Sequence, residues 1–323
     1  MDFVGDLTFS INDIEAAAER IRAHVHHTPM LSSSTLDAAI GSTVRAKCEH
    51  LQRSGSFKIR GALNKMMQLT PEEAARGVIA FSSGNHAQGV ALAGRILGIA
   101  TTIVMPFDAP AVKKAATAGY GATIVEYDRY EGKREAVALE IAEKTGAVLV
   151  PPFNDPQVAA GQGTCGLEVI ADWPEVEVAV IPVGGGGLIA GMATALRAKL
   201  PGIRIVGVEP EVANDAQQSL AAGRIIEIPQ PKTVADGVAS PAVGTVTFPV
   251  ILAYVDEIVT VPEQEILDAT KWLATYMKQI LEPTGALTTA ALLNHRISGV
   301  TGKRVLTIFC GGNADLGIFG SQP

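Results

Sequence analysis

Residues 77–98 have the sequence GVIAFSSGNHAQGVALAGRILG, in which a short apolar run is followed by a longer helical pattern. The alternation continues with the apolar run TTIVMP at 101–106, a helical stretch, and the apolar run ATIVEY at 122–127. Because strands that alternate with helices along a chain form βαβ units, this segment predicts a parallel sheet. The expected fold class is therefore α/β.

The same alternation resumes in the second half of the chain. VAVIPV at 178–183, RIVGVE at 204–209 and VLTIFC at 305–310 predict the strands of a second parallel sheet. Between the two regions, PPFNDPQ at 151–157 is rich in Pro, Asn and Asp, which is typical of a domain crossing. We expect two open αβα domains, a larger one formed by residues 1–76 and 153–323, and a smaller one formed by residues 77–152.

Charge and composition exclude several classes of protein. The 26 basic and 33 acidic residues give a net charge of −7, and no basic tract is dense enough to bind nucleic acid. Residues 178–196 carry no charge, but Pro182 and the glycines after it would break a membrane helix, so we expect a strand, a loop and a buried helix. Three cysteines without a CxxC pattern, and a start without the basic residues of a secretory signal, favour a cytoplasmic location.

Lys58 follows a Ser/Gly turn and has apolar neighbours in the motif SFKIRGA at 56–62. A lysine that is held in an apolar pocket loses proton affinity and becomes a nucleophile toward an aldehyde. The alternative is an ordinary solvated lysine on the surface. The motif alone leaves both interpretations open.

The glycine run GGGGLIAG at 184–191 lies after a predicted strand and before a predicted helix. Consecutive glycines let the backbone approach a ligand closely, and a phosphate at a helix N-terminus is the usual ligand of such a loop. As an alternative, Gly185, Gly187 and Ala190 match a dinucleotide fingerprint with Glu209 as its ribose-binding acid, which would indicate an NAD-binding oxidoreductase. That alternative leaves the lysine motif without a role.

A third polar motif, SSGNHAQG at 82–89, lies where a predicted strand turns into a helix. Its hydroxyls, its amide and the free backbone amides of the helix start together favour a carboxylate site. Ordinary helix capping is the alternative, although a single serine would satisfy it.

Together, SFKIRGA, SSGNHAQG and GGGGLIAG resemble the serine and threonine dehydratase and serine racemase group of fold-type-II pyridoxal-phosphate enzymes. ADGV at 235–238, LEPTGA at 281–286 and CGGN at 310–313 also follow the order of that family. The resemblance implies an ammonia-lyase that converts serine, threonine or 3-hydroxyaspartate to a 2-oxo acid and ammonia, and it extends to serine racemase activity. It also implies a homodimer.

By this resemblance, Lys58 carries pyridoxal phosphate as a Schiff base, and Ser83 faces Lys58 as a second acid–base residue. Cys310 then lies at the pyridine nitrogen, and Arg134 is either a contact for a second substrate carboxylate or a solvated side chain. The implied cofactor contacts are Phe57, Lys58, Asn85, Gly184, Gly185, Gly186, Gly187, Leu188 and Cys310. The implied substrate contacts are Ser82, Ser83, Asn85, His86, Arg134 and Ser240.

Glu209, the carbonyl of Ala213, and Asp215 repeat the spacing of a divalent cation site in the racemase-like members of that family. Two carboxylates and a carbonyl, completed by water, suit a hard ion such as Mg²⁺ or Ca²⁺. A polar loop after a strand is the alternative interpretation of the same residues.

Overall fold

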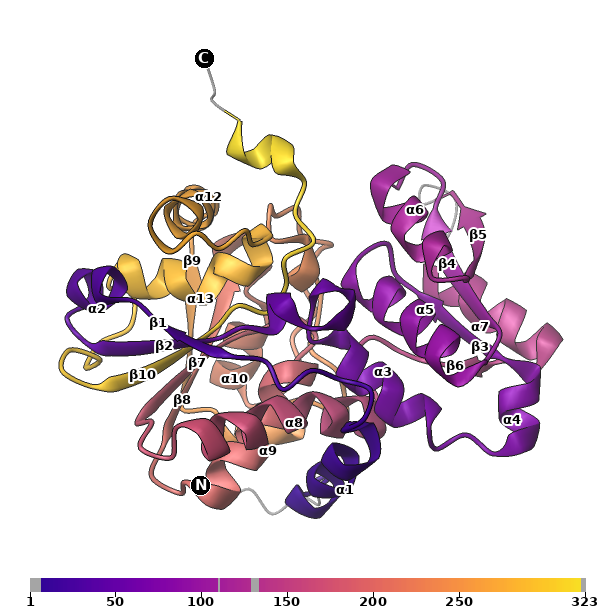
Figure 1. The fold of residues 1–323 in the computed structure, drawn as a ribbon, viewed down its shortest axis with the longest axis horizontal. Helices are drawn as coiled ribbons and strands as arrows, with labels where there is room; N and C mark the ends of the chain where they lie inside the picture. The colour runs from indigo at the N-terminus through magenta and orange to yellow at the C-terminus, as the bar shows by residue number, and fades with distance from the viewer. Residues whose placement is uncertain (1–6, 110, 129–133, 321–323) are drawn as a thin grey trace.

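Two sheets organise the chain, and the computed structural model describes residues 7–109, 111–128 and 134–320, without the side chains of Val112 and Arg134 (Figure 1). All neighbouring strands are parallel except β1 and β2, which are antiparallel. The larger sheet has the order β1 (Met30–Ser32), β2 (Thr43–Lys47), β10 (Arg304–Ile308), β7 (Val178–Pro182), β8 (Arg204–Pro210) and β9 (Glu257–Val261). The smaller sheet has the order β5 (Thr123–Tyr127), β4 (Thr101–Pro106), β3 (Val78–Phe81) and β6 (Val148–Leu149).

Helices cover both faces of each sheet. The α-helices are α1 (Ile11–Ile21), α2 (Ser34–Ile40), α3 (Lys58–Met66), α4 (Pro71–Arg76), α5 (Asn85–Leu97), α6 (Ala111–Gly119), α7 (Arg134–Thr145), α8 (Pro156–Asp172), α9 (Gly187–Lys199), α10 (Asp215–Ala222), α11 (Phe248–Tyr254), α12 (Glu263–Trp272) and α13 (Pro283–Leu293). Short helical turns include η1 (Glu49–Leu51), η3 (Glu211–Ala213) and η4 (Asp236–Val238). The α/β class with parallel sheets is confirmed, while the boundaries at residues 76 and 152 stay a prediction.

Alternate residues of the central strands enter separate cores. In β7, Val178 and Val180 pack into one apolar cluster of the larger sheet, whereas Ala179 and Ile181 pack into the cluster on the opposite face. Successive side chains of a strand point to opposite faces, so a strand that is covered on both sides must be apolar throughout. This requirement explains the unbroken apolar runs of the sequence.

The uncharged stretch at residues 178–196 forms β7, the glycine loop and most of α9, as expected from its proline and glycines. Within residues 7–109, 111–128 and 134–320, no helix combines the length and the apolar character that a membrane span requires.

Helix α3, which begins at Lys58, lies between the two sheets (Figure 1). It packs against α8 where Gly61 and Gly161 meet, and a Cβ atom on Gly161 would lie 2.6 Å from the Cα atom of Gly61. On its other side it packs against α5, where a Cβ atom on Gly89 would lie 3.1 Å from the Lys58 backbone. Glycine at these contacts brings three helix backbones together around the lysine.

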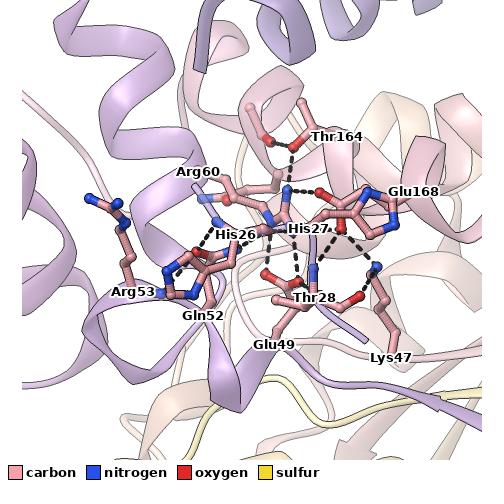
Figure 2. A network of polar contacts seen from close by, with 12 residues as sticks. His26, His27, Thr28, Lys47, Glu49, Gln52, Arg53, Arg60, Thr164 and Glu168 are labelled. Atoms are coloured by element: carbon pink, nitrogen blue, oxygen red, sulfur yellow. Dashed lines mark hydrogen bonds and ion pairs between the residues drawn. The ribbon is translucent and has the colours of Figure 1, made fainter. Parts of the chain in front are cut away.

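A buried polar network fixes the first turn of α3 to the larger sheet. Figure 2 shows Arg60 between two carboxylates: its guanidinium donates to Glu49 from Nε and Nη2, both at 2.8 Å, and to Glu168 at 2.7 and 2.9 Å. Lys47 Nζ lies 2.7 Å from Glu168 and donates to the carbonyl of Thr28. Because a buried charge is costly unless it is paired, this network holds α3 in one position.

Candidate active site

A cavity of about 170 Å³ opens at the carboxyl ends of β3, β6, β7 and β10. Ligands of open parallel sheets collect at this edge, because the loops after the strands converge there. The predicted site residues that line the cavity are Phe57, Lys58, Ser82, Ser83, Asn85, His86, Gly184, Gly185, Gly186, Gly187, Leu188, Ser240 and Cys310. The fold therefore brings together residues that are up to 253 positions apart in the chain, from Phe57 to Cys310 (310 − 57).

Lys58 begins α3, and its Nζ donates to the carbonyl of Pro152 at 3.0 Å. The ammonium group also lies 5.0 Å from the centre of the Phe57 ring. Burial lowers the pKa of Lys58 from 10.5 to about 8, although Cys310 and Glu282 act in the opposite direction. A lysine with this pKa has an appreciable neutral fraction near pH 8, which a nucleophile or general base requires.

The glycine loop leads from β7 into α9, with Gly186 in the left-handed region at φ +89° as the residue before the helix. No side chain caps α9, so the backbone amides of its first turn face the cavity edge without a capping partner from a side chain. The ring of Phe153 covers the loop, and a Cβ atom on Gly185 would lie 2.2 Å from that ring. This is the arrangement of a phosphate site at a helix N-terminus.

Cys310 follows β10 and is buried at the cavity wall. Its Sγ donates to the carbonyl of Thr284 at 3.4 Å. Burial, with a further contribution from Glu282, raises the pKa of the Cys310 thiol. The side chain is therefore a neutral thiol at ordinary pH.

The turn before α5 supplies the polar side of the cavity. Gly84 is the residue before the helix, and no side chain caps α5, so ordinary capping does not account for Ser82 and Ser83. Asn85 donates to Glu282 and accepts a hydrogen bond from Asn313 at 2.7 Å. The free helix start and the two hydroxyls form a site suited to a carboxylate.

Six further polar or aromatic side chains line the cavity, although no role was predicted for them from the sequence: Phe81, Lys113, Phe153, Asp236, Glu282 and Thr284. Asp236 and Glu282 lie within the ADGV and LEPTGA motifs, which supported the family resemblance but predicted no role for either side chain. Burial, and secondarily Asp236, raises the pKa of Glu282 from 4.5 to about 7, against the effects of Asn85 and two lysines. The Arg134 side chain lies outside the described residues.

The candidate cation site lies apart from the cavity lining, at the end of β8 and in the turn that follows it. The Glu209 carboxylate accepts hydrogen bonds from the backbone amides of Ala216 at 3.1 Å and Gln217 at 2.9 Å. Neither oxygen of the Asp215 carboxylate has a hydrogen-bond partner of normal geometry. Burial and Asp215 raise the pKa of Glu209, and burial raises that of Asp215 to about 7. Throughout the described ranges, no group of three or more His, Cys, Asp or Glu side chains could hold a metal ion.

Comparison with known proteins gives a consistent result. Residues 21–311 match the family described as pyridoxal-phosphate dependent enzyme. The chain is 45% identical to an L-threo-3-hydroxyaspartate ammonia-lyase of Saccharomyces cerevisiae, over 94% of this chain and 93% of that protein. It is 46% identical to an L-threonine ammonia-lyase of Thermotoga maritima, over 95% of this chain and 76% of that protein.

Among solved structures, maize serine racemase superposes with a TM-score of 0.93 at 41% identity, covering 96% of this chain and 95% of that one. The racemase and the two ammonia-lyases cover the activities expected from the motifs. Nothing in these comparisons supports the dinucleotide interpretation of Gly185, Gly187 and Ala190.

Proposed function

This chain belongs to the family of pyridoxal-phosphate dependent enzymes, and we propose that it converts a small β-hydroxy amino acid to a 2-oxo acid and ammonia. The observation that carries the proposal is Lys58, a lysine of lowered pKa in a cavity between two uncapped helix starts. Serine, threonine and 3-hydroxyaspartate are the candidate substrates, and serine racemisation is a further candidate activity.

The residues present fit pyridoxal phosphate. The phosphate would bind the amides of the loop from Gly184 to Leu188, where Phe153 leaves no room for a side chain on Gly185. Phe57 and Asn85 would contact the ring, and the neutral Cys310 thiol would face its nitrogen without forcing protonation. When bound, the cofactor supplies an aldehyde carbon for an amine and a ring that disperses negative charge.

The side chains of this protein then divide the remaining work. Ser82, Ser83 and the amide of His86 would hold the substrate carboxylate at the start of α5, with Ser240 as a further contact. Lys58 Nζ would take the proton from the α-carbon, and the bond from the β-carbon to the hydroxyl oxygen would break, with the hydroxyl leaving as water once it gains a proton. The released enamine would then react with one water to give the 2-oxo acid and ammonia. A pKa of about 8 suits a base of this kind, because the neutral amine is available at ordinary pH.

We also propose that Glu209, the Ala213 carbonyl and Asp215 hold Mg²⁺ or Ca²⁺. The support is the Asp215 carboxylate, which is buried without a hydrogen-bond partner and lies near a second buried acid. A hard cation would satisfy these oxygens and fix the start of α10. The cation would serve stability, because none of the three residues lines the cavity.

A homodimer in the cytoplasm remains our expectation for the assembly. The three cysteines are buried and free, which is compatible with a reducing compartment. Sedimentation of the purified protein would measure the assembly directly.

The test combines labelling with an assay. Borohydride reduction of the cofactor-loaded protein should label Lys58, and 2-oxo acid should form from at least one of the three substrates. Lys58→Ala should abolish both results, whereas Lys144→Ala, which changes an exposed lysine on α7, should abolish neither. A colourless protein that retains NAD would refute the proposal in favour of the dinucleotide interpretation.

A further inference from the structure

Lys113 reaches the cavity from α6 of the smaller sheet, where it forms an ion pair with Asp236 of η4. Asp236 belongs to the part of the chain around the larger sheet, so the pair spans the two halves of the cavity. Lys113 also lies close enough to Glu282 to lower the pKa of that carboxyl. The lysine therefore presents its charge at the cavity and not to bulk solvent alone.

The proposed reaction assigns no role to Lys113, because other groups of the cavity already supply what it requires. Among the described residues that line the cavity, Lys58 and Lys113 are the only lysines or arginines. Lys58 is committed to the cofactor and the α-proton, and the uncapped start of α5 can bind the α-carboxylate. Within the described lining, Lys113 is the cation that remains for a negative group elsewhere on the substrate.

The partner that Lys113 now has can be exchanged at little cost. The Asp236 side chain is 54% exposed and that of Lys113 is 24% exposed. An ion pair exposed to this degree contributes at most about 1 kcal/mol, since solvent screens it. A substrate carboxylate that takes the place of Asp236 would gain a charged contact inside the cavity and give up only that screened pair.

We propose that Lys113 binds the second carboxylate of a dicarboxylic amino acid, which makes 3-hydroxyaspartate the preferred class of substrate for this site. The proposal rests on the proposed function for the position of the amino acid. Asp236 then acts as the resident carboxylate that the substrate displaces. Lys113 lies on α6, beside the smaller sheet, and Asp236 lies in η4, in the part of the chain around the larger sheet. The exchange would therefore replace a contact between the two halves of the cavity with a contact to the substrate.

The test measures binding without turnover. L-aspartate and L-alanine lack a β-hydroxyl and differ by one carboxylate, so the change in cofactor absorbance gives a dissociation constant for each. The protein should prefer L-aspartate, and Lys113→Met should reduce that preference by about tenfold or more. Lys113→Arg should retain most of the preference, because the charge is kept, and Asp236→Asn should increase it.

Lys114→Met is the matched control, since Lys114 is the next residue on α6 but pairs with Glu126 and does not line the cavity. It should leave the preference unchanged. Equal affinities for the two amino acids, no detectable binding of L-aspartate, or a preference that survives Lys113→Met would overturn the proposal.

The 2-oxo acid assay separates this proposal from the proposed function. If serine or threonine is converted but L-aspartate is not preferred, only the role of Lys113 fails. If L-aspartate is preferred through Lys113 but none of the three hydroxy amino acids yields a 2-oxo acid, the proposed reaction is refuted and the proposed carboxylate site is retained.

Discussion

Arg60 Nε lies 2.8 Å from Glu49 Oε2, and both side chains are completely buried. The guanidinium also holds Glu168, so one residue joins η1, α3 and α8 two positions after Lys58. Removing one partner leaves the other charges buried and uncompensated. The network therefore connects the stability of the fold to the position of the lysine.

Arg60→Met should lower the free energy of unfolding by about 3–5 kcal/mol, because two buried carboxylates lose their shared partner. Arg60→Lys should recover little of this loss, since an ammonium group cannot bind two carboxylates in the bidentate manner of a guanidinium. Urea unfolding measures both variants. A loss below about 1 kcal/mol for Arg60→Met would contradict the role assigned to the network.

Gly185→Ala should weaken binding of pyridoxal phosphate, because its Cβ atom would lie 2.2 Å from the Phe153 ring and would displace the loop. Overpacking of this kind costs about 1–3 kcal/mol. Fluorescence titration of the cofactor-free protein gives the affinity. Gly202→Ala is the control, since nothing lies within 4 Å of a Cβ atom there, and equal affinities of the two variants would refute the prediction.

The rate of cofactor capture by the cofactor-free protein should rise with pH up to about 8 and then level off, following the pKa of Lys58. Only the neutral amine attacks an aldehyde, and burial shifts the neutral form to lower pH than in a free lysine. Stopped-flow absorbance gives the rate at each pH. A model lysine amine measured in parallel corrects for ionisation of the aldehyde, and a corrected rate that still climbs at pH 10 would contradict the lowered pKa.

Ser83→Ala should abolish turnover of D-serine and any racemisation while elimination from the L-isomer continues. Racemisation requires a proton donor on the face opposite Lys58, whereas elimination from an L-substrate requires one base only. Turnover of both isomers, measured together with the melting temperature, tests this role. If a folded Ser83→Ala protein still consumes D-serine, another residue is the donor.

Mg²⁺ or Ca²⁺ should raise the melting temperature in a concentration-dependent manner, since an ion that binds only the native state stabilises it by mass action. Asp215→Asn should remove most of this response, because the buried carboxylate supplies the charge. Glu211→Gln changes an acid in the neighbouring turn and serves as the control. An undiminished increase in melting temperature in Asp215→Asn would show that the ion binds at another site.

The sequence predicted the sheets because a strand such as β3, buried on both faces, has to be apolar at every position, and such short apolar runs alternate with longer helical patterns along the chain. It predicted most of the cavity lining because turns after strands concentrate glycines and hydroxyls at one edge. Lys113 and Asp236 escaped prediction for a physical reason. Each is an ordinary charged residue in its own segment, and only the approach of the two sheets brings them together.

The strand order of the larger sheet also constrains the sequence of events during synthesis. β10 lies between β2 and β7, so the middle of that sheet can form only after residues near 308 have left the ribosome. The smaller sheet uses only residues 78–149 and has all its strands much earlier. A nascent chain thus has one finished sheet and one incomplete sheet whose apolar strand edges are exposed. Cys310 is among the last cavity residues to emerge, and its arrival completes the wall of the cavity.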